Sequence, residues 1–114
     1  MMTGPDPRWD DPDAEVVEFL IRGNEDPEFA LSFDDIPRAL RPDLRPSKLR
    51  PGFDTSGHHE IDVEGCIIDF SAEPVGWQVS MLNPPSESWA LEVAQEILQR
   101  MSRVSGQGGR VVRL

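Results

Sequence analysis

The sequence predicts a single α+β domain, with a mostly antiparallel sheet of five to six strands and one long C-terminal helix packed on one face. Three observations predict it. Between residues 59 and 81, apolar and polar residues alternate in three short segments, which is the period of half-buried strands. Between residues 86 and 106, apolar residues recur at every third or fourth position, as in an amphipathic helix. The length of 114 residues suits one hydrophobic core and is too short for two.

The clearest strand pattern lies in the centre of the chain. Segments 59–63, 66–70 and 77–81 each alternate, and the turn-forming stretches 64–65 (EG) and 73–76 (EPVG) separate them. We therefore expect a three-stranded antiparallel meander. The alternation also predicts that one face of this meander is covered by the rest of the chain and that the other is wet and acidic.

The lone cysteine, Cys66, shares the predicted covered face with Ile68 and Phe70. A reactive thiol needs nearby positive charge or a helix N-terminus to favour the thiolate. The residues flanking Cys66 in this region are acidic instead, so we interpret it as a small buried hydrophobe. Trp77 follows the same pattern, and we expect it in the core as well.

The N-terminal part predicts a hairpin after a flexible leader at 1–12, with the domain spanning 13–114. Segment 14–21, AEVVEFLI, is compatible with a helix that starts at a proline and ends at a glycine, but it also alternates like a strand. Segment 28–33, EFALSF, alternates again after the turn-rich RGNEDP. We therefore favour two strands forming a hairpin.

The C-terminal part carries the most regular helix. Ser86 is placed to cap its start, Gly106 to end it, and acidic residues lie early and arginines late, which suits the helix dipole. Residues 110–114, RVVRL, are long enough for a last short strand. The apolar stripe expected to cover the sheet is Ala90, Val93, Ala94, Ile97, Leu98, Met101 and Val104.

A proline- and arginine-rich stretch separates the two halves of the chain. A short helix is predicted from Asp35 to about Leu40, with a proline in its first turn. Prolines then forbid long regular structure, so 41–57 is predicted to be a surface loop. Its cations could contact nucleic acid phosphates, dock an acidic protein or pair with the protein's own acidic sheet. This possible second surface comprises Arg41, Arg45, Lys48 and Arg50.

The charges are segregated along the chain. There are 21 acidic and 11 basic side chains, a formal net charge of −10. Residues 1–36 hold eleven acids and two bases, 37–57 two acids and five bases, and 58–99 eight acids and no base; four arginines follow from residue 100. Such a surface attracts basic partners and repels nucleic acid phosphates over most of its area. The charge therefore argues against a general nucleic-acid binder, although solubility alone would explain it equally well.

Nothing in the sequence indicates a catalytic site, a cofactor or a membrane span. His58, Glu60 and Asp62 would line one strand face, but adjacent histidines point to opposite faces and three ligands along one strand chelate poorly, so no metal is expected. No Gly-rich loop precedes a helix and no Ser-His-Asp arrangement is recognisable. A single cysteine and the lack of a charged-then-apolar leader predict a cytoplasmic protein. Export without a cleaved leader stays open.

The half of the chain from about His58 to Leu114 resembles immunity proteins of bacterial polymorphic toxin systems. The resemblance lies in a small acidic α+β unit with a GW-x-V strand after a Pro/Gly turn, here Gly76-Trp77-Gln78-Val79, followed by a helix that closes the sheet. It implies a protein that binds a toxin, often a basic nuclease, and blocks it sterically. The expected contact residues are Glu60, Asp62, Glu64, Asp69 and Glu73, with exposed Trp9 or Trp89 as an anchor.

The leading hypothesis is therefore a non-catalytic, acidic protein-binding module, an immunity or antitoxin-like inhibitor of a basic partner protein. An accessory protein that contacts nucleic acid or a larger complex through the Arg/Pro-rich loop is the alternative. A metal-dependent enzyme is a distant third hypothesis.

Overall fold

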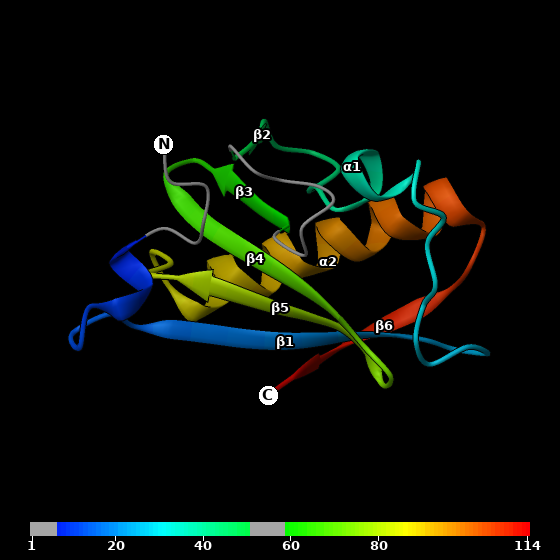
Figure 1. Cartoon of the computed structure of the whole chain (residues 1–114), viewed down its shortest axis with the longest axis horizontal. Coiled ribbons are helices and arrows are strands. Elements are labelled where there is room, and N and C mark those ends of the chain that lie inside the picture. Colours follow the sequence, from blue (N-terminus) through cyan, green and yellow to red (C-terminus); the bar gives the residue numbers. More distant parts are fainter. Residues whose placement is uncertain (1–6, 51–58) are drawn as a thin grey trace.

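The structure is a computed structural model, and it describes residues 7–50 and 59–114 (Figure 1). Within these ranges the chain forms six strands, one long helix, one short helix and one 3-10 turn. In chain order the elements are η1 (Pro7–Asp10), β1 (Val16–Gly23), α1 (Ile36–Ala39), β2 (Lys48–Leu49), β3 (His59–Val63), β4 (Cys66–Glu73), β5 (Gly76–Leu82), α2 (Glu87–Ser105) and β6 (Gly109–Arg113).

The strands form one antiparallel sheet in the order β2-β3-β4-β5-β1-β6, and α2 lies across one face of it (Figure 1). The predicted α+β class is thus confirmed. The central meander β3-β4-β5 is also confirmed, and so are the predicted last strand, which is β6, and the short helix, which is α1. The first strand, β1, lies between β5 and β6, so the first and the last strand of the sheet in chain order are hydrogen-bonded to each other.

The core lies between α2 and the sheet face that the alternation predicted to be covered. Cys66, Ile68 and Phe70 of β4 all face it, and the register places each of the last two opposite an apolar residue of β5. Helix α2 contributes fully buried side chains from its predicted stripe: Ala90, Val93, Ala94, Ile97 and Met101. One continuous cluster therefore holds helix and sheet together.

Both ends of α2 carry the caps that the sequence predicted. The Ser86 hydroxyl accepts a hydrogen bond from the Trp89 backbone N–H at 3.0 Å. Gly106 has φ of 77°, the left-handed conformation that ends helices, and its N–H donates to the Ser102 carbonyl at 2.8 Å. In the described ranges, no helix combines the length and the apolar composition needed to cross a membrane.

The predicted N-terminal hairpin is wrong. Its first strand exists as β1, but residues 28–33 are irregular, and Phe29 has φ of 54°. Asp26 causes this, because its carboxylate accepts the backbone N–H groups of Glu28 at 3.2 Å and Ala30 at 3.3 Å. These contacts turn the chain locally. β6 then pairs with the edge of β1 that a hairpin partner would have used.

Phe29 is buried although it is not in a strand. Its side chain is 0% exposed, and its backbone carbonyl accepts a hydrogen bond from the Trp77 indole Nε1 at 2.8 Å. The alternation of 28–33 thus correctly indicated that Phe29 is buried, but the backbone around this residue is irregular and forms no strand. Periodicity over six residues did not distinguish the two.

The sheet face opposite α2, called the open face below, is less wet than predicted. Ile67 and Leu82 point to this face and are directly opposite each other, yet they are 0% and 2% exposed. Acidic and polar residues occupy other positions of the same face. The prediction of a uniformly solvated acidic face is therefore corrected to a face with an apolar part and an acidic part.

Candidate functional site

A row of polar side chains crosses the open face from β3 to β1. The register places Glu60 opposite Asp69, Asp69 opposite Ser80, and Ser80 opposite Glu18. We call these four residues the cross-strand row. Glu60 and Asp69 were predicted partner contacts, whereas Glu18 and Ser80 were missed. Both occupy the polar positions of alternating segments, but only the pairing of β1 with β5 brings them into line with the other two.

The members of the cross-strand row differ in exposure. Glu60 is only 4% exposed, and its Oε1 lies 4.0 Å from the Arg50 Nε. Asp69, Ser80 and Glu18 are half-buried. The Glu18 carboxylate accepts a hydrogen bond from Gln78 Nε2 at 2.5 Å, which holds it against the sheet. A partner can therefore reach the row at Asp69, Ser80 and Glu18. Glu60 is too buried to be the surface contact that the sequence predicted.

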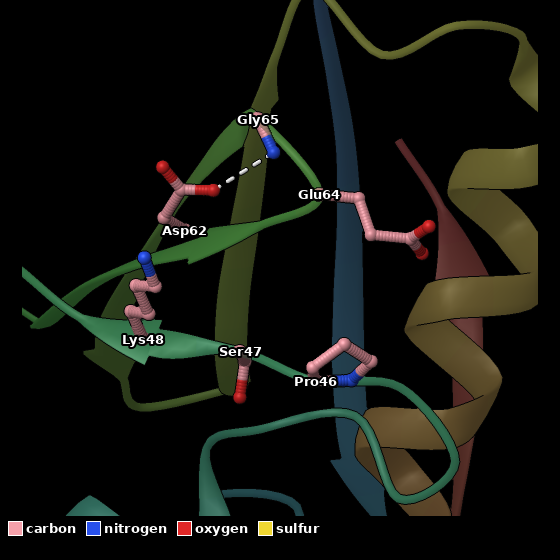
Figure 2. Close-up of a pocket in the computed structure, with 6 residues that line it drawn as sticks. All are labelled: Pro46, Ser47, Lys48, Asp62, Glu64 and Gly65. Atoms are coloured by element: carbon pink, nitrogen blue, oxygen red, sulfur yellow. Dashed lines mark hydrogen bonds between the residues drawn. The ribbon is translucent and has the colours of Figure 1, made fainter.

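The other predicted acids lie apart from the row. Asp62 and Glu64 line an open hollow of about 420 Å³ together with Pro46, Ser47, Lys48 and Gly65. In Figure 2 the Lys48 side chain points toward Asp62, which is its cross-strand partner, while Glu64 points toward α2. Asp62 Oδ1 accepts the Gly65 backbone N–H at 2.8 Å, so this carboxylate closes the β3–β4 turn. Two of the predicted contact acids, Asp62 and Glu64, thus line the same hollow as Lys48, a cation of the predicted second surface.

Glu73 lies at the far end of β4, where the chain turns into β5. Its carboxylate accepts the Ser71 hydroxyl at 2.7 Å. The five predicted contact residues thus form no single patch. Asp62 and Asp69 share the open face at neighbouring strands, whereas Glu73 is separated from them along β4.

The cations of the Arg/Pro-rich loop are mostly engaged within the protein. Arg45 contacts three carboxylates, with distances of 2.9 Å to Glu96, 2.6 Å to Glu92 and 3.2 Å to Glu64. Its guanidinium group also lies 5.6 Å from the ring centre of Trp89, within cation–π range. The Glu96 hydrogen bond is the largest of the effects that raise the pKa of Arg45. Arg45 is therefore a permanent structural cation rather than a free contact.

The remaining members of the predicted second surface differ from Arg45. Arg41 donates to the Ser47 hydroxyl at 2.9 Å and to its carbonyl at 2.7 Å, which folds the loop on itself. Arg50 is held beside Glu60, and its backbone N–H donates to the Glu60 carbonyl at 2.9 Å. Lys48 is exposed. Internal pairing thus accounts for much of this surface, but with α2 and the β3–β4 turn more than with the sheet face.

Two of the predicted aromatic anchors are less exposed than expected. Trp9 and Trp89 are both half-buried. Trp89 packs against the core cluster and under Arg45, and Trp9 has its indole Nε1 shielded from solvent with no hydrogen-bond partner. Neither is the exposed anchor expected from the sequence.

The Cys66 thiol has the surroundings of a buried hydrophobe. It is 4% exposed, and its Sγ donates to the Leu82 carbonyl at 3.4 Å. Burial, followed by the nearby Asp62 charge, raises the pKa of this thiol to about 11. A thiol with that pKa stays protonated at neutral pH and is a poor nucleophile.

The row of His58, Glu60 and Asp62, which the sequence did not favour as a metal site, is only partly described by the structure. His58 lies outside the described residues, and His59 packs with its ring centre 6.0 Å from that of Trp77. Across 7–50 and 59–114, no three His, Cys, Asp or Glu side chains are grouped as a metal site would require. No protein-family model, curated protein or solved structure matches this chain.

Proposed function

We propose that the protein is a non-catalytic, acidic binding module for a basic partner protein, an immunity or antitoxin-like inhibitor. The observation that carries this proposal is the geometry of the open face, where Glu18, Asp69 and Asp62 present carboxylates from three different strands of one rigid sheet. Charges mounted on a sheet keep their backbone spacing, so binding orders no loop and loses less entropy than binding through a mobile segment. A basic surface with matching spacing would therefore bind with little rearrangement.

The overall charge supports the same proposal. A net charge of −10 on 114 residues produces a negative field that accelerates encounter with a cationic partner. Arg45 does not offset the acids of the open face, because it pairs with Glu92 and Glu96 of α2 and with Glu64 of the β3–β4 turn. The same observation disfavours the alternative of a nucleic-acid accessory protein that uses the Arg/Pro-rich loop.

The GW-x-V segment supports the fold rather than the interface. Gly76 has φ of 139° and approaches the Ile21 carbonyl so closely that a Cβ would lie 2.5 Å from it. Trp77 and Val79 are buried in the core. The segment on which the resemblance rests thus has internal roles here, and the proposal depends on the charged open face instead.

The test is an association experiment with a defined partner. The product of a neighbouring toxin-like reading frame is co-expressed and purified, and its on-rate with the full chain is measured from 50 to 500 mM NaCl. Steered association should slow by about tenfold or more over this range. The double variant Glu18→Gln/Asp69→Asn should lower the on-rate, whereas the charge-matched control Glu25→Gln/Glu28→Gln, on the exposed turn after β1, should do so much less.

The outcomes separate the proposal from simple acidity. Equal effects of the two double variants would show that only net charge matters and would remove the open face from the interface. An on-rate that is independent of salt would contradict a basic partner altogether.

A further inference from the structure

Two arginines lie directly opposite each other on the open face at the β1–β6 end of the sheet. Strands β1 and β6 lie side by side (Figure 1). Arg22 of β1 pairs with Arg110 of β6, and neighbouring pairs are Leu20 with Val112 and Gly23 with Gly109. Side chains of such a pair leave the sheet on the same side, with Cβ atoms about 5 Å apart. Like charges in this position repel each other and destabilise the pairing. The arrangement therefore calls for a compensating negative charge.

Among the described residues, no carboxylate pairs with either arginine. Arg22 and Arg110 have no side-chain hydrogen bond or ion pair within the described part of the chain. The other eight arginines all have a partner. Five contact carboxylates, namely Arg38, Arg45, Arg50, Arg103 and Arg113. Arg41 and Arg100 donate to carbonyl or hydroxyl oxygens, and Arg8 makes another contact within the protein. In a chain with 21 acids, two unpaired neighbouring arginines stand out.

A second observation points to an absent acceptor. The Arg22 Nε is shielded from solvent and has no hydrogen-bond partner. A buried donor that is left unpaired is unfavourable, so native proteins rarely leave one without protein or ligand acceptor. The Arg22 side chain runs beside Gly76 of β5, where a Cβ would lie 3.2 Å from the Arg22 Cγ, so the stem of this arginine is packed against the sheet. The Arg22 Nε–H, which lacks an acceptor, thus belongs to the same arginine pair that lacks a compensating negative charge.

We propose that Arg22 and Arg110 form an oxyanion-binding site that accepts a phosphate or a carboxylate group. Guanidinium groups bind both groups through paired N–H donors, and the half-buried Leu20 and Val112 beside them would contact an apolar part of the same ligand. This site is separate from the acidic residues of the cross-strand row and does not rest on the proposed binding of a basic partner.

The experiment is an NMR titration of the full chain with inorganic phosphate in one arm and succinate in the other, at constant ionic strength set with NaCl. The Arg22 Nε–H signal and the backbone amides of β1 and β6 should shift saturably in at least one arm. The arm that saturates identifies the group. Arg110→Gln should weaken binding by about tenfold, the loss of one charge-assisted hydrogen-bonding partner. Arg22→Lys keeps the charge but should also weaken binding, because a lysine lacks the fork of donors.

The control is Arg38→Gln, which removes the same charge from an exposed helix position. It should leave the dissociation constant within about twofold of the wild type, since screening makes distant charges weak. Shifts that do not saturate in either arm would overturn the proposal. So would equal weakening by Arg38→Gln and Arg110→Gln, which would reduce the effect to net charge.

Discussion

The guanidinium group of Arg45 lies 2.9 Å from the carboxylate of Glu96, and this ion pair ties the 41–50 segment to α2. Both side chains are largely covered, with 17% and 8% of their surface exposed. The Glu96 carboxylate also accepts the Leu44 backbone N–H at 3.3 Å. The packing of α2 therefore includes a loop on its outer side as well as a sheet on its inner side.

Replacing one member of this pair should be strongly destabilising. We expect Arg45→Met to lower the free energy of unfolding by about 3 kcal/mol, because Glu96 would remain as a buried charge without its partner. Urea denaturation measures the change. The double variant Arg45→Met/Glu96→Met should recover much of the loss, since it removes both charges and fills their space with apolar atoms. A double variant no better than Arg45→Met would contradict a direct pair.

Gly76 should tolerate no side chain. Gly76→Ala combines a strained φ of 139° with a Cβ 2.5 Å from the Ile21 carbonyl, so we expect a loss of about 3 kcal/mol. Gly106→Ala is the matched control, because its φ is also positive but no atom lies within 4 Å of the added Cβ. It should cost only about 1 kcal/mol. Thermal unfolding of both variants measures these losses. Similar losses of stability in the two variants would show that the positive φ, and not the contact with the Ile21 carbonyl, determines the effect at Gly76.

The hydrogen bond from Trp77 to the Phe29 carbonyl should be measurable in stability. Trp77→Phe leaves this carbonyl without its donor and removes buried ring atoms, which together should cost about 2–3 kcal/mol. Trp89→Phe makes the same change at a half-buried ring and should cost about 1 kcal/mol. Equal losses in urea denaturation would mean that the indole N–H contributes nothing at residue 77.

The Cys66 thiol should react slowly in the folded protein. Its pKa is raised from 9.0 to about 11, so at pH 8 its thiolate fraction is about 100-fold below that of an unfolded thiol. A disulfide reagent should therefore label native protein at least that much more slowly than protein in urea. Rapid native labelling would show that the thiol is accessible and ionised.

The same shift sets a pH dependence of stability. A folded-state pKa above the unfolded value means that the stabilising contribution of this thiol is complete below pH 9 and is lost as the pH rises toward 11. Cys66→Ala should abolish this part of the alkaline loss. An unchanged alkaline slope in Cys66→Ala would assign the loss to other groups.

Local patterns were sufficient to predict α2 and the meander β3-β4-β5, but not β2, which lies in the segment predicted to be a loop, nor the irregular backbone of 28–33. The stripe of α2 and the alternation of β3, β4 and β5 each depend on contacts between near neighbours in the chain, and such periods can be read without knowing what the element packs against. The burial of Cys66 and Trp77 followed from the same alternation. The resemblance to immunity proteins stays a prediction.

The tertiary structure alone decided which segments became neighbours. β1 is inserted between β5 and β6, and this pairing determines both the cross-strand row through Glu18 and the facing of Arg22 with Arg110. The partners of Arg45 are likewise 19 to 51 residues away along the chain. Such pairings depend on loop closure and on the fit of whole surfaces, which no short stretch encodes. Sequence determined the elements and the sign of the charge, whereas the fold decided where those charges meet.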